Sequence, residues 1–209
     1  MMIVNFEAFL IAITILTLTP GLDTALVIKN SSRGGLADGA MTSLGICLGL
    51  FVHATFSAVG ISAILAQSAE LFSLVKMVGA AYLIWLGASC LVSLYRGQAN
   101  GMEVAMASSG VNLKRSVREG FLSNVLNPKT AVFYLAFLPQ FIDPNGSAFL
   151  PSLLMASIHF VIAMIWQCGL AGALDKAKGL LQSSTFMRRM EATTGAVLVA
   201  LGVKLLIEE

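Results

Sequence analysis

Long apolar runs, separated by short polar segments, dominate the chain. A helix needs about 20 apolar residues to cross the hydrocarbon core of a membrane, and all of the runs but the last reach that length. The pattern predicts an all-α membrane protein with six transmembrane helices. A five-span chain, in which the last run or the first does not cross, is the alternative. The predicted spans are 5–28, 40–67, 71–95, 120–142, 148–174 and 191–207.

Composition supports a membrane location and excludes some partners. Hydrophobic residues make up 57% of the 209 residues, charged residues only 11%, and the mean hydropathy is +0.84. A soluble domain carries roughly 25% charged residues. The net charge of +2 is too small to indicate a nucleic-acid partner. We expect the chain to be surrounded by membrane lipid instead. No Lys or Arg precedes Lys29, so the basic start of a signal peptide is missing and the first run is kept as mature protein.

Basic residues fall mainly in the connections after the first, third and fifth spans. These connections are 29–38, 96–119 and 175–190, whereas the opposite ones offer only Lys76 and Lys204 near helix ends. Lys and Arg are enriched in cytoplasmic loops of membrane proteins. We therefore expect the three basic connections in the cytoplasm and both chain termini outside.

The two halves of the chain resemble each other. Short motifs in the first half recur in the same order and at nearly constant spacing in the second half. A duplicated unit with three spans must insert its second copy upside down, which is a common plan in secondary transporters. The sequence thus predicts one domain, 1–209, with a repeat at about 1–95, a cytoplasmic linker at about 96–119 and a second repeat at about 120–209. The matching motifs are Thr19-Pro20 with Asn127-Pro128, His53 with His159, and Gly79-Ala80 with Gly195-Ala196.

Helices 1 and 4 are each expected to be broken inside the membrane. Thr and Asn favour the N-cap of a helix, and Pro favours its first turn. Each break would point the N–H groups of a half-helix at the bundle centre, where they suit a carboxylate. Asp23 follows the first break, and Lys129 follows the second. The candidate substrate-binding or coupling residues here are Thr19, Pro20, Gly21, Asp23, Asn127, Pro128 and Lys129.

A charge in the membrane needs a partner. The cost at the bilayer centre is about 2.5 to 3.5 kcal/mol on insertion scales. The ammonium group of a substrate is one candidate partner for Asp23. A purely structural ion pair between Asp23 and Lys129, locking the two broken helices together, is the alternative.

The histidines admit two interpretations. His53 and His159 lie near the centres of their predicted spans and could relay protons, or hold a haem in a redox protein. Hydrogen bonding between helices is the other interpretation. We expect no metal site and no cofactor, because no Cys or acidic cluster accompanies the histidines. The absence of a carboxylate or thiolate cluster also argues against a cation exporter, and no hydrolase, phosphate-loop or metalloprotease motif indicates an enzyme.

Four stretches together resemble the LysE/RhtB family of amino-acid exporters. They are TPGLDTALVI at 19–28, GAMTSLGICLGLFVHATFSAVG at 39–60, KMVGAAYLIWLGASCL at 76–91 and GFLSNVLNPKTAVFYLAFLPQFI at 120–142. The resemblance covers essentially the whole chain. His53, in the second stretch, and Gln140, in the last, are further candidate site residues. It implies efflux of neutral amino acids such as homoserine, threonine or leucine across the bacterial inner membrane, driven by protons. Whether the chain forms a homodimer is left open.

Overall fold

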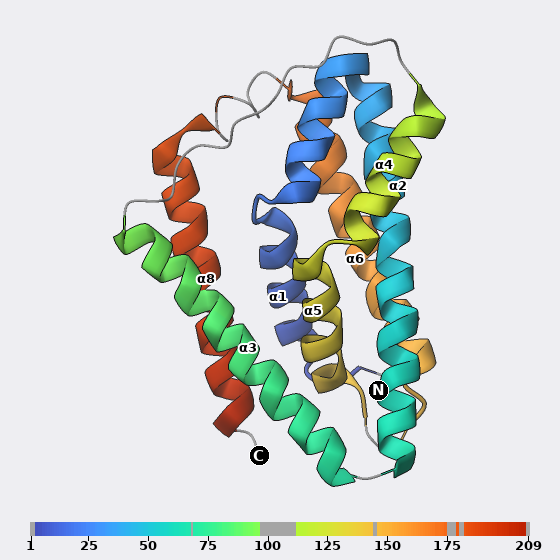
Figure 1. Ribbon diagram of the computed structural model, residues 1–209, viewed down its shortest axis with the longest axis vertical. Coiled ribbons are helices and arrows are strands. Elements are labelled where there is room, and N and C mark those ends of the chain that lie inside the picture. Colours follow the sequence, from blue (N-terminus) through green and yellow to red (C-terminus); the bar gives the residue numbers. More distant parts are fainter. Residues whose placement is uncertain are drawn as a thin grey trace.

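The computed structural model describes residues 3–67, 69–96, 112–143, 146–174, 179 and 182–207. In this part of the chain the structure is almost entirely helical, and the one β contact is an isolated bridge between Ile3 and Ile142. The elements are α1 (Phe6–Leu18), α2 (Leu22–Gln67), α3 (Ala69–Tyr95), α4 (Leu113–Val125), α5 (Pro128–Phe137), the 3-10 helix η1 (Leu138–Phe141), α6 (Phe149–Gly172) and α8 (Ser184–Ile207) (Figure 1).

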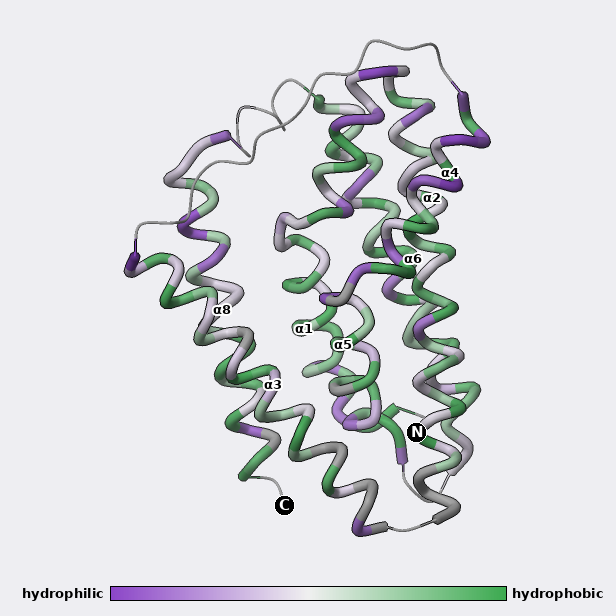
Figure 2. The backbone as a smooth tube through the Cα atoms, in the orientation of Figure 1, coloured by the Kyte–Doolittle hydropathy of each residue, from purple (hydrophilic) through white to green (hydrophobic). Residues whose placement is uncertain are grey.

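The helices support the expected all-α membrane protein. Three segments of the described chain are long and apolar enough to cross a membrane: Leu22–Ala63, Met77–Tyr95 and Phe149–Gly172. The helix Phe6–Leu18 is apolar but shorter. Figure 2 shows hydrophilic residues gathered at the end of the molecule where α4 begins, and hydrophobic residues over most of the remaining helix length. The duplication into two inverted repeats with six spans stays a prediction.

Helix α2 reverses direction at a glycine pair. Gly34 and Gly35 have non-helical backbone angles, and Gly35 has a φ of 69°, which glycine adopts without steric cost. The two arms of α2, 22–33 and 36–67, run back beside each other (Figure 1), and Asn30 Nδ2 donates a hydrogen bond to Thr42 Oγ1 at 2.9 Å. The predicted connection 29–38 is therefore mostly helical, with the turn confined to the glycines.

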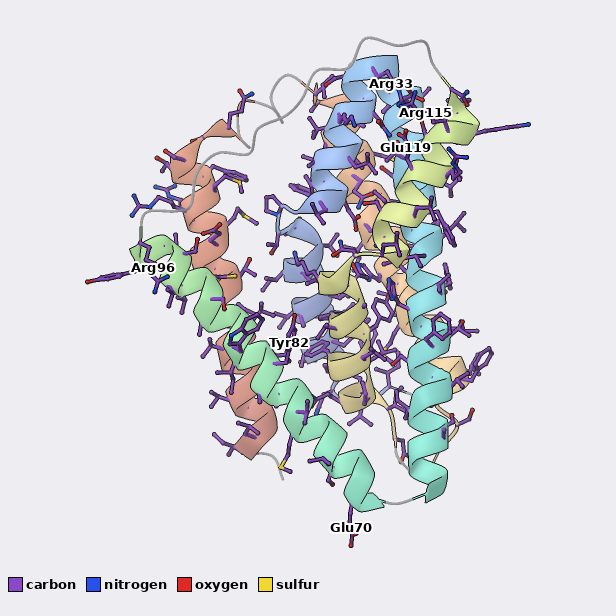
Figure 3. All side chains as sticks on the ribbon, in the orientation of Figure 1. Arg33, Glu70, Tyr82, Arg96, Arg115 and Glu119 are labelled. Carbon is purple, nitrogen blue, oxygen red and sulfur yellow. The ribbon has the colours of Figure 1, made fainter. Side chains whose placement is uncertain are left out.

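A buried ion pair fastens this turn to α4. Arg33 Nε lies 2.9 Å from Asp38 Oδ2, and the two side chains are only 1% and 0% exposed. The hydroxyl of Ser116 on α4 accepts from Arg33 Nη2 at 2.7 Å and donates to Asp38 Oδ1 at 2.6 Å. Arg33 also lies 3.4 Å from Glu119 (Figure 3). Arg33 and Asp38 thus neutralise each other within α2, and Ser116 and Glu119 of α4 add polar contacts to this buried pair.

Glu119 links the same region to a second arginine at the surface. Its carboxylate accepts from Arg115 Nε at 2.6 Å and from Asn30 Nδ2 at 2.9 Å. Burial alone would raise the pKa of Glu119, but the hydrogen bonds from Arg115 and Asn30 outweigh it and lower the pKa below its ordinary value. Glu119 is therefore stabilised in its charged form.

The last part of the predicted linker is helical. Residues 97–111 lie outside the described residues, and α4 begins at Leu113, so residues 113–119 form the first turns of a helix. Asn112 caps this helix by accepting from Arg115 N at 3.0 Å. The early turns of α4 carry Lys114, Arg115, Arg118 and Glu119, whose polarity hides the helix from a hydropathy pattern.

Two helix pairs pack through glycine. A Cβ on Gly120 of α4 would collide with the backbone at Thr42 of α2, and a Cβ on Gly87 of α3 would lie 2.6 Å from the carbonyl oxygen of Gly195 in α8. Small residues let helix backbones approach this closely in a membrane. The pair α3 and α8 lies beside the other helices (Figure 1), and both pairs depend on a missing side chain.

We expect Gly120→Ala to lower the free energy of unfolding by about 1 to 3 kcal/mol, the usual cost of an overpacked contact. The added methyl group has to push apart the backbones of α2 and α4. Thermal unfolding in detergent measures this effect. The matched control is Gly169→Ala in α6, where nothing lies within 4 Å of the added Cβ. Equal stability of the two variants would contradict the close packing.

Candidate functional site

Both predicted helix breaks are present. Helix α1 ends at Leu18 and α2 begins at Leu22, while α4 ends at Val125 and α5 begins at Pro128. Asn127 is the N-cap of α5, and its Oδ1 accepts from Lys129 N at 3.0 Å. Pro128 needs no such partner because it has no N–H. The Asn-Pro pair therefore starts a helix, as its chemistry predicts.

Asp23 joins the first break to the second. It lies in the first turn of α2, and its carboxylate accepts hydrogen bonds from three side chains around the end of α4 and the start of α5. Ser123 Oγ donates to Oδ1 at 2.8 Å, while Asn124 Nδ2 and Asn127 Nδ2 donate to Oδ2 at 3.0 and 3.2 Å. Neutral donors and the N-terminus of α2 together stabilise the charge.

The ion pair considered between Asp23 and Lys129 is not formed. Neither residue takes part in the ion pairs within 4.0 Å that join Arg33, Asp38, Arg115 and Glu119. Lys129 Nζ instead lies 3.5 Å from the backbone oxygen of Thr19, at the C-terminal end of α1. The carbonyl end of a helix carries partial negative charge and attracts a cation. A broken helix has two charged ends, and Lys129 faces the one that the sequence prediction left out.

Thr19 also ties α1 to α8. Its hydroxyl donates to Ile15 O at 2.6 Å, and the same oxygen lies 2.6 Å from Thr194 Oγ1. Thr194 is buried in α8. Thr19 thus closes α1 and connects it to another helix, whereas the sequence predicted an N-cap role for its side chain.

A cavity of about 50 Å³ lies between the two breaks. One water molecule requires about 10 to 15 Å³ on this measure, so the cavity has room for a few water-sized groups. It brings together most of the predicted site residues, although Pro20, His53, Pro128 and Gln140 are not among the described lining residues. The lining residues are Leu16, Thr17, Thr19, Gly21, Leu22, Asp23, Thr24, Ile46, Leu50, Asn124, Asn127, Lys129, Thr130, His159, Ala163 and Gln167.

The predicted residues outside the lining have other positions. Pro20 lies in the segment between α1 and α2, and Pro128 starts α5. Gln140 is buried in η1, at the far end of α5 from the break. His53 is buried on α2, and its Nε2 is hydrogen-bonded to the carbonyl oxygen of Asn124 at 2.9 Å. His53 therefore contacts the backbone of Asn124, which lines the cavity, and does not itself belong to the described lining.

Tyr134 on α5 packs against both histidines. Its ring centre lies 5.8 Å from that of His53 and 5.9 Å from that of His159, and its hydroxyl is hydrogen-bonded to His159 Nδ1 at 3.0 Å. The histidines thus hydrogen-bond between helices, which favours the structural interpretation over haem binding. No group of three His, Cys, Asp or Glu side chains suited to a metal ion occurs among the described residues.

The sequence prediction missed several polar side chains around the cavity. Ser123 and Asn124 donate to Asp23, and Thr130 and Gln167 line the same space. Each is a polar residue inside a predicted apolar span, which is the signal that identifies it. The site is therefore more polar and more neutral than the single acid and base suggested.

Two helix breaks inside an apolar bundle, with a carboxylate and an amine at a shared cavity, are an arrangement that secondary transporters commonly have. The model of the LysE type translocator family matches residues 14–209. The chain belongs to this family, as the resemblance predicted.

Relatives of similar length are found in several bacteria. The chain is 36% identical over 202 residues to the uncharacterized membrane protein YrhP of Bacillus subtilis, with 94% of this chain and 96% of YrhP covered. An uncharacterized membrane protein of Vibrio cholerae is 34% identical, with 95% and 94% covered. A homoserine/homoserine lactone efflux protein of Salmonella typhi is 27% identical, with 95% and 94% covered. No solved structure matches the chain.

Proposed function

We propose that the protein exports small neutral amino acids from the bacterial cytoplasm and binds them in the cavity between the two helix breaks. The observation that carries the proposal is the pair of opposite charges at this cavity, Asp23 and Lys129, without an ion pair between them. An amino acid has an ammonium and a carboxylate of its own. Its ammonium can pair with Asp23 and its carboxylate with Lys129, so one molecule binds both charged side chains in one step.

The two groups of the substrate have different partners. The ammonium binds Asp23, which accepts three neutral hydrogen bonds, while a carboxylate has about four acceptor positions. The carboxylate binds Lys129 and the first N–H groups of α2, where the partial positive charge of the helix end favours an anion. Both groups of the substrate are thereby bound inside an otherwise apolar bundle.

The name of the Salmonella relative, a homoserine/homoserine lactone efflux protein, supports the ammonium as the common recognition element. Homoserine and its lactone share the ammonium group, whereas only homoserine has a free carboxylate. We infer that homoserine, threonine and amino acids of similar size are the substrates to test first. The apolar wall formed by Leu16, Ile46 and Leu50 suits a short side chain.

Transport follows from alternating access between two inverted repeats of three spans. Asp23 belongs to the first repeat, and its donors Ser123, Asn124 and Asn127 belong to the second. Movement of one repeat against the other therefore makes and breaks the hydrogen bonds to Asp23. Proton coupling arises when Asp23 takes up a proton as the substrate leaves. The cavity of about 50 Å³ has to widen for the substrate to enter.

The proposed orientation places residues 96–119 in the cytoplasm and both termini outside, in the inner membrane. We expect an engineered cysteine at position 108 to react with a membrane-impermeant reagent only after cells are broken, and cysteines at positions 2 and 209 to react in intact cells. The three native cysteines are first replaced. Labelling of position 108 from outside overturns the orientation, and protection of position 2 favours five spans. Cross-linking in the same membranes tests for a homodimer.

The experiment that tests the function uses purified protein in sealed vesicles. The vesicles are loaded with labelled homoserine, threonine, leucine or lysine, and release is compared with and without an imposed proton gradient. We expect release of the neutral amino acids, faster with the gradient, and little release of lysine. Release of none of the amino acids contradicts the proposal. A haem absorption band, or release of a metal cation instead, would favour one of the two alternatives.

A further inference from the structure

Helix α6 presents a polar residue to the cavity that the proposed roles of Asp23 and Lys129 do not use. His159, Ala163 and Gln167 all line the cavity. They are spaced four residues apart, so they share one face of the helix. Gln167 is buried, and its Oε1 has no hydrogen-bond partner in the described part of the chain. A buried carbonyl oxygen of this kind destabilises the protein unless a donor reaches it.

The packing of α6 against the first arm of α2 places Gln167 at the level of Asp23. Ala171 of α6 and Val27 of α2 belong to one small apolar cluster with Ile46, and both segments run in the same direction (Figure 1). One helical turn is about 3.6 residues, so one turn back from Val27 is Asp23 and one turn back from Ala171 is Gln167. Both side chains border the same cavity.

A second unpartnered oxygen at the cavity has a different explanation. Asn124 Oδ1 is also without a partner among the described residues, but a Cβ on Gly49 would lie only 2.6 Å from it. The backbone of α2 therefore covers this oxygen. The amide orientation of Asn124 is fixed, because its Nδ2 donates to Asp23. Gln167 Oε1 is therefore the remaining acceptor of the two that can receive a hydrogen bond from a ligand.

We propose that Gln167 is the second acceptor for the substrate ammonium, beside Asp23. The inference rests on the proposed amino-acid transport. An ammonium has three donors and no acceptor, so one carboxylate oxygen does not satisfy it. The carbonyl oxygen of Gln167 accepts a hydrogen bond from a second N–H of the ammonium and adds no charge to the site. A site that binds an ammonium by two separate acceptors requires at least two N–H donors from its substrate.

The test compares homoserine with N,N-dimethylhomoserine, which keeps the positive charge but has one N–H instead of three. Both are measured as competitors of labelled homoserine in the vesicle assay, with wild-type protein and with Gln167→Met, which keeps the size and loses the carbonyl. We expect the wild type to prefer homoserine, and the preference to fall about tenfold in Gln167→Met. The half-saturating concentration of homoserine should rise by a similar factor at nearly unchanged maximal rate.

The matched control is Trp166→Phe. Trp166 Nε1 is also buried without a partner in the described chain, but Trp166 packs against the cluster of Ile28, Leu170 and Met187 and does not line the cavity. Its preference should equal that of the wild type. If Gln167→Met does not fold, Gln167→Asn withdraws the same carbonyl by one methylene group and should show the same fall.

The outcomes separate this inference from the proposed function. An unchanged preference in a folded Gln167 variant, with active wild-type protein, overturns the role of Gln167 alone. Absence of amino-acid transport by the wild type overturns the proposed function and this inference with it. A loss of maximal rate in both Gln167→Met and Trp166→Phe, at unchanged preference, assigns both residues to packing.

Discussion

Asp23→Asn should lower proton-driven efflux by about hundredfold or more while the protein remains folded. Removing one member of a buried charge pair formed with a ligand costs about 2 to 5 kcal/mol, and each 1.4 kcal/mol is tenfold. The measurement is release of labelled homoserine from vesicles, together with thermal unfolding of the same samples.

The hydrogen bonds around Asp23 explain why the fold should survive this change. An Asn oxygen in place of Oδ2 still accepts from Asn124 and Asn127, and an Asn nitrogen in place of Oδ1 can donate to Ser123, whose hydroxyl turns round. The substitution therefore removes the charge and keeps the contacts. Ser123→Ala is the control that loses one hydrogen bond and keeps the charge. Normal uphill efflux by Asp23→Asn would exclude Asp23 from substrate binding and coupling.

Arg33→Met should be among the most destabilising single substitutions in the chain. It leaves Asp38, whose side chain is 0% exposed, with Ser116 as its remaining partner. Breaking a buried pair in this way costs about 3 to 5 kcal/mol, because an uncompensated charge stays buried. Thermal unfolding in detergent measures the loss, and Arg33→Met with Asp38→Asn should recover most of it.

The control for this prediction is Arg115→Met. The pair of Arg115 and Glu119 is an i,i+4 contact on one helix, with side chains 47% and 27% exposed. Such exposed pairs contribute about 0.3 to 0.5 kcal/mol. Similar losses for the two arginine variants would mean that Arg33 and Asp38 are not buried as described. Failure of the double variant to recover would show that the turn needs the charges themselves.

The sequence allowed the helix breaks to be predicted because their causes are local. Asn127-Pro128 starts α5, and Pro20 follows the end of α1, so each proline marks a break from its own local chemistry. The turn at Gly34 and Gly35 also has a local signal, although hydropathy assigned the flanking residues to a connection. The start of α4 was not predicted, because its first turns are polar and a polar helix gives no signal in a hydropathy pattern.

The partners in the site could not be predicted in the same way. Asp23 and its donors are separated by 100 to 104 residues. Opposite charge made Lys129 the natural candidate, yet Ser123, Asn124 and Asn127 hold the carboxylate. Such contacts depend on how α2 packs against α4, and glycine at positions 45 and 120 brings these helices together. Neutral donors in a membrane span are individually inconspicuous, so only the fold reveals their convergence.

The separation of Asp23 and Lys129 has an electrical consequence. One negative and one positive group border the cavity, and a zwitterionic amino acid brings one charge of each sign, so binding the proposed substrate does not change the net charge of the site before a proton is taken up. The membrane potential acts with about 2.3 kcal/mol per elementary charge and 100 mV, but only on net charge that moves across the field. Under the proposed mechanism, carrying the substrate is therefore expected to be electrically silent, and the voltage dependence of the cycle is expected to come from the proton alone.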